Sequence, residues 1–316
     1  MPAFRREPKA EERYRAMKPS LKAILFAVPF IGGYYLMRSL PVSPCDFLHE
    51  ETYNADGAVD YCGPGDSLFV DLSLRKWPLT LDFRSPNELH PGQSGEFELD
   101  IRQFDGTPLA ENDVALSHTR RIHLLAVDQT LSDYHHLHPE PDALHDGVWR
   151  FSLTPRNPGR YAVFLDFIPT RSPRRVLLTS SFEVAGQPSV VKPNRESLAF
   201  SSGKREFKLE RLDPDAAGEG ELKLLFRATD QEGKPLRLRP VMGAFAHMVA
   251  FDATLKGFAH LHPEENVLPA EESDSHEGTL TFAFTPPKPG FYRLWAQVRI
   301  GREPETFVPF DLKTGS

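Results

Sequence analysis

Cysteine is almost absent from the sequence, which contains only Cys45 and Cys62. Neither has a second cysteine at CxxC spacing, which argues against thiolate zinc sites and thioredoxin-like chemistry. If this part of the chain lies outside the cytoplasm, we expect one disulfide closing a short loop, because disulfides persist in oxidising compartments. Two unpaired thiols are the alternative.

A net positive charge and the short motifs of several enzyme classes are also missing. The formal net charge is -7, and no basic cluster occurs beyond the N-terminus, which argues against nucleic acid as a partner. We find no Ser/His/Asp arrangement in a motif context, no phosphate-binding loop and no glycine-rich dinucleotide turn. The sequence therefore predicts no catalytic residues, and it favours a non-enzymatic role while leaving the question open.

Proline and phenylalanine, in contrast, are abundant. The chain has 29 prolines and 23 phenylalanines but only 5 methionines, and 40% of its residues are apolar. Many prolines and aromatics with few long apolar periodic runs are typical of an all-β protein with many turns. At 316 residues the chain is long enough for two domains of ordinary size.

The N-terminal part has the pattern of a membrane anchor. Residues 1–20 are polar and basic and predict a cytoplasmic tail, and residues 21–40 predict an uncleaved transmembrane signal anchor of nearly the minimum spanning length. Because basic residues precede the anchor, we expect a single pass through the inner membrane with the C-terminal domains in the periplasm or outside the cell. A cleaved signal peptide and a buried core helix are the alternatives. Residues 41–76 predict a juxtamembrane segment with one strand.

The rest of the chain has a β pattern that occurs twice. Short strands separated by glycine and proline turns predict a sandwich or barrel. The turn at Thr154–Tyr161 recurs at Thr285–Tyr292 with the same Pro-Gly-x-Tyr ending, which is typical of a tyrosine corner. A period above 100 residues indicates duplicated domains, and we place them at residues 77–187 and 188–316.

The most informative feature is a histidine motif that each repeat carries. One copy runs from His123 to Glu140 and the other from His247 to Glu264, and both read His, twelve residues, His-x-His-Pro-Glu. A further histidine follows each copy. Of the twelve histidines, eight fall at matched positions: His123, His136, His138, His145, His247, His260, His262 and His276.

We expect each motif to form a β-hairpin. If the loop between the strands closes symmetrically, paired residue numbers in the first hairpin sum to about 261, which places His123 opposite His138. His136 is two residues from His138 and therefore lies on the same face. Three imidazoles then converge in each repeat, and a register slip of one residue would separate them.

Three neutral imidazoles are suitable ligands for zinc, Cu(II), Ni(II) or Fe(II), whereas calcium and magnesium prefer oxygen ligands. His145 and His276 are candidates for a fourth ligand or a second-shell partner, and Glu140 and Glu264 for orienting an imidazole. His118 has no counterpart in the second repeat, so we treat it as a bystander, as we do His135. The alternative is that the histidines serve only structural hydrogen bonds.

The His-(x)12-His-Leu-His-Pro pattern with its Pro-Gly-x-Tyr turn resembles one found in bacterial exported β-sandwich proteins, often anchored by one helix and associated with copper or heavy-metal handling. The resemblance covers residues 115–187 and 240–312, and it implies an immunoglobulin- or cupredoxin-like sandwich. The chain lacks the Met-rich pattern of periplasmic copper chaperones and the Cys-His-Met set of blue copper sites, which argues against electron transfer. The implied metal ligands are His123, His136, His138, His247, His260 and His262.

These observations predict an all-β protein with two tandem sandwich domains after one transmembrane helix. Each domain is expected to bind about one copper ion, with zinc as the alternative, for storage, delivery or resistance. The expected partners are the membrane, through the helix, and a metal-delivery partner or membrane protein complex. Two other functions stay open: a structural module that contacts a membrane complex, and a His-ligated metalloenzyme.

Overall fold

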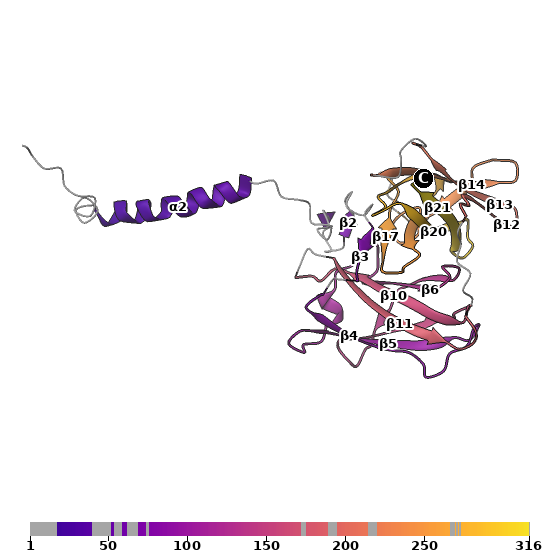
Figure 1. Ribbon diagram of the computed structural model, residues 1–316, viewed down its shortest axis with the longest axis horizontal. Coiled ribbons are helices and arrows are strands. Elements are labelled where there is room, and N and C mark those ends of the chain that lie inside the picture. The colour runs from indigo at the N-terminus through magenta and orange to yellow at the C-terminus, as the bar shows by residue number, and fades with distance from the viewer. Residues whose placement is uncertain are drawn as a thin grey trace, which may run out of the picture. The chain divides into compact units, whose positions relative to one another are not determined.

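Strands dominate the computed structural model of the chain (Figure 1). The chain forms two compact units, Met1–Cys45 and Asp46–Ser316. The expected disulfide between Cys45 and Cys62 lies outside the described residues. The structure describes residues 18–39, 52–53, 59–61, 69–73, 76–171, 175–188, 195–213, 220–265, 269, 271 and 273–315.

The first unit contains the helix α2 (Pro19–Ser39), where the sequence predicts the anchor. The helix has Pro29 in its interior, and Lys22 and two tyrosines interrupt its apolar sequence. The predicted helix is confirmed, but the predicted span is not supported, because no helix in the described part of the chain is both long and apolar enough to cross a membrane.

The first repeat is a β-sandwich of two antiparallel sheets. Apolar residues from both sheets, among them Leu99, Trp149 and Val163, pack into one core between them. A short 3-10 helix, η2 (Glu111–Asp113), follows β5. One sheet has the order β4 (Leu79–Arg84), β5 (Gly95–Gln103), β9 (Val148–Leu153), β8 (Glu140–Pro141), and the other β11 (Val176–Val184), β10 (Gly159–Phe167), β6 (Ile122–Asp128), β7 (Tyr134–Leu137).

The second repeat has the same arrangement with its own core. One sheet has the order β12 (Ala199–Ser202), β13 (Arg205–Arg211), β14 (Leu222–Asp230), β19 (Thr279–Phe284). The other has the order β18 (His276–Glu277), β15 (Arg237–Arg239), β20 (Gly290–Ile300), β16 (His247–Asp252), β17 (Gly257–Leu261), β3 (Val70–Asp71), with β21 (Thr306–Thr314) on β20.

The strand β3 departs from the expected domain order. It precedes the first repeat in sequence, yet it pairs antiparallel with β17 at the edge of the second repeat, with Val70 opposite Phe258. A backbone hydrogen bond of 2.8 Å from Leu72 N to Lys256 O extends this pairing. The strand therefore covers an edge that would otherwise expose unpaired backbone groups. A second short pair, β1 (Thr52–Tyr53) with β2 (Val59–Tyr61), also precedes the first repeat.

Both predicted tyrosine corners are confirmed. The Tyr292 hydroxyl donates a 2.7 Å hydrogen bond to the carbonyl of Lys288. In the first repeat the Tyr161 hydroxyl accepts a 3.0 Å bond from the Asn157 amide. In each case the tyrosine is tied to the backbone four residues before it, which fixes the turn that enters β10 or β20.

The first strand of each histidine hairpin, β6 or β16, is buried on both faces. Every residue of β6 and β16 is buried, although antiparallel sheets commonly have one face in solvent. Along β6, Leu124 and Ala126 belong to the core of the first repeat, whereas His123 and Leu125 alternate with them on the opposite face and belong to neither core. The second face is covered by the other repeat.

Aromatic residues form much of this contact between the repeats. Tyr134 stacks on Trp295 with ring centroids 5.6 Å apart, and Phe164 lies 5.3 Å from Phe258. A polar contact joins the repeats as well, since Arg293 donates a 3.1 Å hydrogen bond to the carbonyl of Leu131. The two histidine motifs meet at this interface.

Candidate metal centre

The hairpin register is the one that the sequence predicts. In the first repeat Leu124 pairs with Leu137 and Leu125 with His136, so paired numbers sum to 261. In the second repeat Met248 pairs with Leu261, which is the equivalent register. The histidine at the start of each hairpin therefore faces the last histidine of the motif, as expected.

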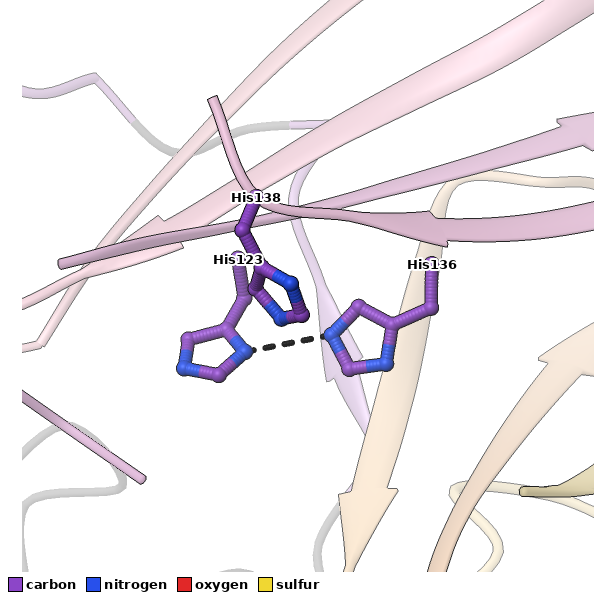
Figure 2. Close-up of side chains that lie close together, drawn as sticks. All are labelled: His123, His136 and His138. Carbon is purple, nitrogen blue, oxygen red and sulfur yellow. Dashed lines mark hydrogen bonds between the residues drawn. The ribbon is translucent and has the colours of Figure 1, made fainter. Parts of the chain in front are cut away.

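Each repeat brings its three motif histidines into one group. Figure 2 shows the rings of His123, His136 and His138 pointing toward one another. Their ring centroids are 5.0–5.3 Å apart, and one ligand nitrogen from each ring lies within 4.8 Å of the others. We call this group triad 1.

The equivalent group in the second repeat is His247, His260 and His262, which we call triad 2. Its ring centroids are 4.7–5.5 Å apart, and its ligand nitrogens also lie within 4.8 Å of one another. In both triads two rings are buried and the third is half-buried. Each triad could hold a metal ion, one per repeat.

In triad 1 the hydrogen bonds determine which nitrogen of each ring faces the centre. The Nε2–H of His123 donates to the carbonyl of Ser117 at 2.9 Å, so its Nδ1 carries the lone pair. The Nδ1–H of His136 donates to Oε1 of Gln297 at 2.7 Å, so its Nε2 carries the lone pair. These two lone-pair nitrogens face each other at 3.1 Å (Figure 2).

Triad 2 repeats this pattern. The Nε2–H of His247 donates to the carbonyl of Val241 at 2.9 Å, which again leaves Nδ1 with the lone pair. Within the described residues, His247 Nδ1 and His260 Nε2 are buried and have no hydrogen-bond partner. Buried polar atoms normally have a partner, and the absence of one commonly indicates an ion or water at the position.

Each triad has a polar side chain of the other repeat beside one of its rings. Gln297, on β20, holds His136 of triad 1, and its amide nitrogen donates to Glu305, which fixes the amide orientation. Asp166, on β10, lies 3.7 Å from Nδ1 of His260 in triad 2. Metal-binding imidazoles usually have such a partner on the second nitrogen, since it determines the tautomer and the ring direction.

Burial keeps most of these imidazoles neutral. Burial, together with the neighbouring His123 and His136, lowers the pKa of His138 to about 2. Burial also lowers the pKa of His136, His247 and His260 well below the usual range, again with help from neighbouring histidines. The neutral imidazole is the form that binds metals, so protons compete weakly for these nitrogens near neutral pH.

His118, which we treated as a bystander from sequence, lies between the triads. Its ring stacks on His262 with centroids 4.4 Å apart, and it lies 5.4 Å from His247 and 5.8 Å from His123. It belongs to a turn closed by Ser117 and Arg120, where its φ of 49° is unusual for a residue other than glycine. The equivalent Met242 has a φ of 47°, so both repeats share this strained turn.

The structure does not bring His145 or His276 to a triad. His145 is exposed, and its ring binds Asp142 at 2.9 Å in the loop before β9. His276 packs on Phe245 and contacts the carbonyl of Glu277. His145 and His276 occupy matched positions because the loop that carries them was duplicated, and not because they bind a metal.

The two glutamates of the motif do not orient imidazoles either. Glu140 is exposed and lies 3.8 Å from Arg120, and Glu264 pairs with Lys223. Each follows a proline that ends the hairpin, so its side chain points away from the triad. His135, the second presumed bystander, pairs with Asp133 at 3.0 Å and has no place in triad 1.

Sequence analysis missed His118 and the orienting pair Asp166 and Gln297. The missed signal for the pair was a polar residue at the same position of two equivalent apolar strands, 131 residues apart. For His118 the sequence contains no such signal, because Met242 is its counterpart. Only the packing of one repeat on the other places it near triad 2.

Comparison with known proteins identifies the two repeats as family domains. Residues 79–184 and 202–315 match the family described as "domain of unknown function (DUF8832)". The chain belongs to this family. No curated protein matches the sequence.

Solved structures give weak similarity only. A DUF4785 family protein from Legionella pneumophila subsp. pneumophila str. Philadelphia 1 is 10% identical with a TM-score of 0.24, over 75% of this chain and 56% of that one. A beta-glucuronidase from Parabacteroides merdae is 8% identical with a TM-score of 0.20, over 74% of this chain. The chain thus spans about half of the first protein and 24% of the second. Both TM-scores are too low to indicate a shared fold or function.

Proposed function

We propose that this DUF8832 protein binds two transition-metal ions, one in each histidine triad, and serves in metal storage, delivery or resistance. The observation that carries the proposal is the 3.1 Å contact between His123 Nδ1 and His136 Nε2. Both nitrogens have lone pairs, so neither can donate to the other. Two facing lone pairs in a buried site repel each other unless a cation lies between them.

The spacing of these nitrogens suits a metal ion. Two imidazole nitrogens that each lie about 2.0–2.1 Å from a tetrahedral ion are separated by roughly 3.3 Å. A proton is the other cation that could join them, but burial lowers the pKa of both rings and leaves that proton the less stable occupant. A metal ion satisfies both lone pairs at once.

We propose copper as the natural metal and zinc as the alternative. The ligands are all imidazoles, and the described neighbours within each triad include no thiolate or ligating carboxylate. Such a set favours copper, zinc, nickel or ferrous iron over calcium and magnesium. In the Irving–Williams order Cu(II) binds nitrogen sites most tightly of the divalent first-row metals.

We further propose that each repeat is an immunoglobulin- or cupredoxin-like sandwich and that α2 anchors the chain to the inner membrane, with the repeats in the periplasm or outside the cell. Apolar side chains are exposed all round the helix, including Phe26, Phe30 and Leu36. Exposed apolar side chains of this kind favour apolar surroundings, either lipid or protein. A metal-delivery partner or a membrane complex would then meet the repeats on that side of the membrane.

Metal analysis of the full chain tests the binding proposal. After incubation with Cu(II) or Zn(II) and removal of free ions, we expect about two equivalents per chain, as measured by elemental mass spectrometry. The double variant His138→Ala/His262→Ala should lose both, because each triad loses its half-buried ligand. The matched control His145→Ala/His276→Ala removes two histidines outside the triads and should retain both ions.

A metal-free wild-type protein, with the same unfolding midpoint as the double variant, would overturn the proposal. It would support a structural role for the histidines instead, in a module that assembles with other proteins. Anchoring is tested separately: the full chain should sediment with membranes after alkaline extraction. Release of the chain into the supernatant would contradict the anchor and leave metal binding unaffected.

A further inference from the structure

The two triads lie much closer together than two independent sites require. The rings of His136 and His260, from different triads, have centroids 5.8 Å apart, and those of His123 and His260 are 6.0 Å apart. Rings within triad 1 are already 5.0–5.3 Å apart. If each metal lies about 3 Å from the centres of its own rings, the two metals are separated by at most about 12 Å.

A small cavity is bordered by histidines of both triads. It measures about 10 Å³ and is lined by His123 of triad 1, by His260 and His262 of triad 2, and by His118. This volume is close to that of one water-sized probe. The cavity is therefore large enough for one oxygen atom that both metals could share.

The charges around the cavity favour an anionic oxygen. Arg175 and Asp166 also line the cavity, and they form a buried ion pair with a 2.6 Å bond from Nε to Oδ1. The Asp166 charge is thus matched by Arg175, which leaves the charge of two metal ions to be compensated. A bridging hydroxide would supply one negative charge at the position where both metals can contact it.

On this basis we propose that the two triads form one dinuclear metal centre, with a water-derived hydroxide bridging the ions in the cavity between the repeats. The inference rests on the proposed metal binding and extends it. A water molecule enters, coordinates both ions and loses one proton to solvent, so the bridge requires no oxidant or reductant. Metals that share an oxygen lie about 3.5–4 Å apart in two-metal sites, a separation within the upper limit that the rings set.

The dinuclear centre also accounts for the way in which the repeats orient each other's ligands. Gln297 holds a ligand of triad 1 and Asp166 approaches a ligand of triad 2, each across the interface. Two independent sites would not need side chains from the opposite repeat beside their ligands. A shared bridge, in contrast, requires both triads to be held in one fixed relation, and these contacts, together with His118 on His262, provide it.

Electron paramagnetic resonance of the full chain loaded with Cu(II) tests the inference. Two copper(II) ions joined by a hydroxide couple their spins, so we expect two coppers per chain by elemental analysis but an integrated signal far below one spin per copper. The variant His262→Ala should bind one copper and restore a full spin for it, because its partner ion is missing. The control His276→Ala should behave as the wild type does.

The outcomes separate this inference from the proposed function. Two coppers per chain with one full spin each would overturn the dinuclear centre and leave metal binding intact. Fewer than two coppers per chain would also overturn it, because a dinuclear centre needs an ion in each triad. A chain that takes up neither Cu(II) nor Zn(II) would overturn both proposals. Because the decisive reading is made on the wild-type protein, it does not depend on how the variants fold.

Discussion

The two triads share one geometry but differ in what surrounds them. Both place a histidine at the start of a hairpin whose Nε2–H binds a backbone carbonyl, of Ser117 in one repeat and Val241 in the other. The differences lie in the orienting groups. Triad 1 is held by the neutral Gln297, and triad 2 faces Asp166 with its partner Arg175.

This comparison separates two tasks within one motif. The hairpin alone brings three imidazoles together, and it does so equally in both repeats. The group beside the second ring of each triad, His136 or His260, comes from the opposite repeat and differs between the triads. We therefore expect equivalent substitutions in the two hairpins to affect their triads equally. A substitution of Gln297 or Asp166 should affect one triad only.

The largest expected effect is a loss of stability in mild acid. Burial lowers the folded-state pKa of several cluster histidines below the ordinary value of 6.5, including His118, His136 and His260. Below pH 6.5 the unfolded chain binds protons that the folded chain does not, so the free energy of unfolding falls as the pH falls. Each such histidine contributes at most about 1.4 kcal/mol per pH unit, and their sum is comparable to the 5–15 kcal/mol of a whole domain.

Urea unfolding of the metal-free chain between pH 8 and pH 5 measures this effect. The slope should become shallower by a similar amount in His136→Gln and in His260→Gln, because each triad loses one buried imidazole. An unfolding free energy that stays constant down to pH 5 would mean that the cluster is hydrated and that the triads are not buried as described.

Replacing the orienting groups should affect stability unequally. Asp166→Asn removes the carboxylate that neutralises the buried Arg175, and breaking a buried ion pair costs about 3–5 kcal/mol. Gln297→Ala leaves a buried imidazole N–H without an acceptor, which costs about 1–3 kcal/mol. Urea unfolding at pH 8 measures the loss of unfolding free energy in each variant. Equal losses would mean that the surroundings of the two triads do not differ in their contribution to stability.

Metal affinity should change by a smaller amount and at one site only. Loss of a side chain that hydrogen-bonds a metal-binding imidazole commonly lowers metal affinity about 10–100-fold. Gln297→Ala is therefore expected to weaken the ion in triad 1, although Gln297 belongs to the second repeat. The measurement is competition with a chelator in the His262→Ala background, where triad 2 is empty and only the ion in triad 1 remains. Unchanged affinity of that ion in Gln297→Ala would show that Gln297 does not orient His136.

The smallest effect is expected from the outlying histidines. His145→Ala and His276→Ala should each leave metal content and chelator competition at wild-type values, since neither ring reaches a triad. The loss of one equivalent in either variant would mean that the surrounding loop rearranges to bring that histidine to the metal.

The sequence was sufficient to predict what depends on local pattern. Alternation and turn residues predicted the strands, and the symmetric loop predicted the register that brings His123 to His138. The packing of one repeat on the other was not predicted, because a strand that is apolar on both faces does not indicate what covers its second face. Asp166, Gln297 and His118 enter the site through that packing, and β3 joins the second repeat in the same way.

Anomalous X-ray scattering at the copper edge, from crystals of the Cu(II)-loaded protein, tests the central claim most directly. We predict two peaks at the interface of the repeats, one of them about 2.0–2.1 Å from both Nδ1 of His123 and Nε2 of His136. The second should contact the matching nitrogens of His247 and His260. Copper bound elsewhere, with the 3.1 Å contact between His123 and His136 unchanged, would contradict the account.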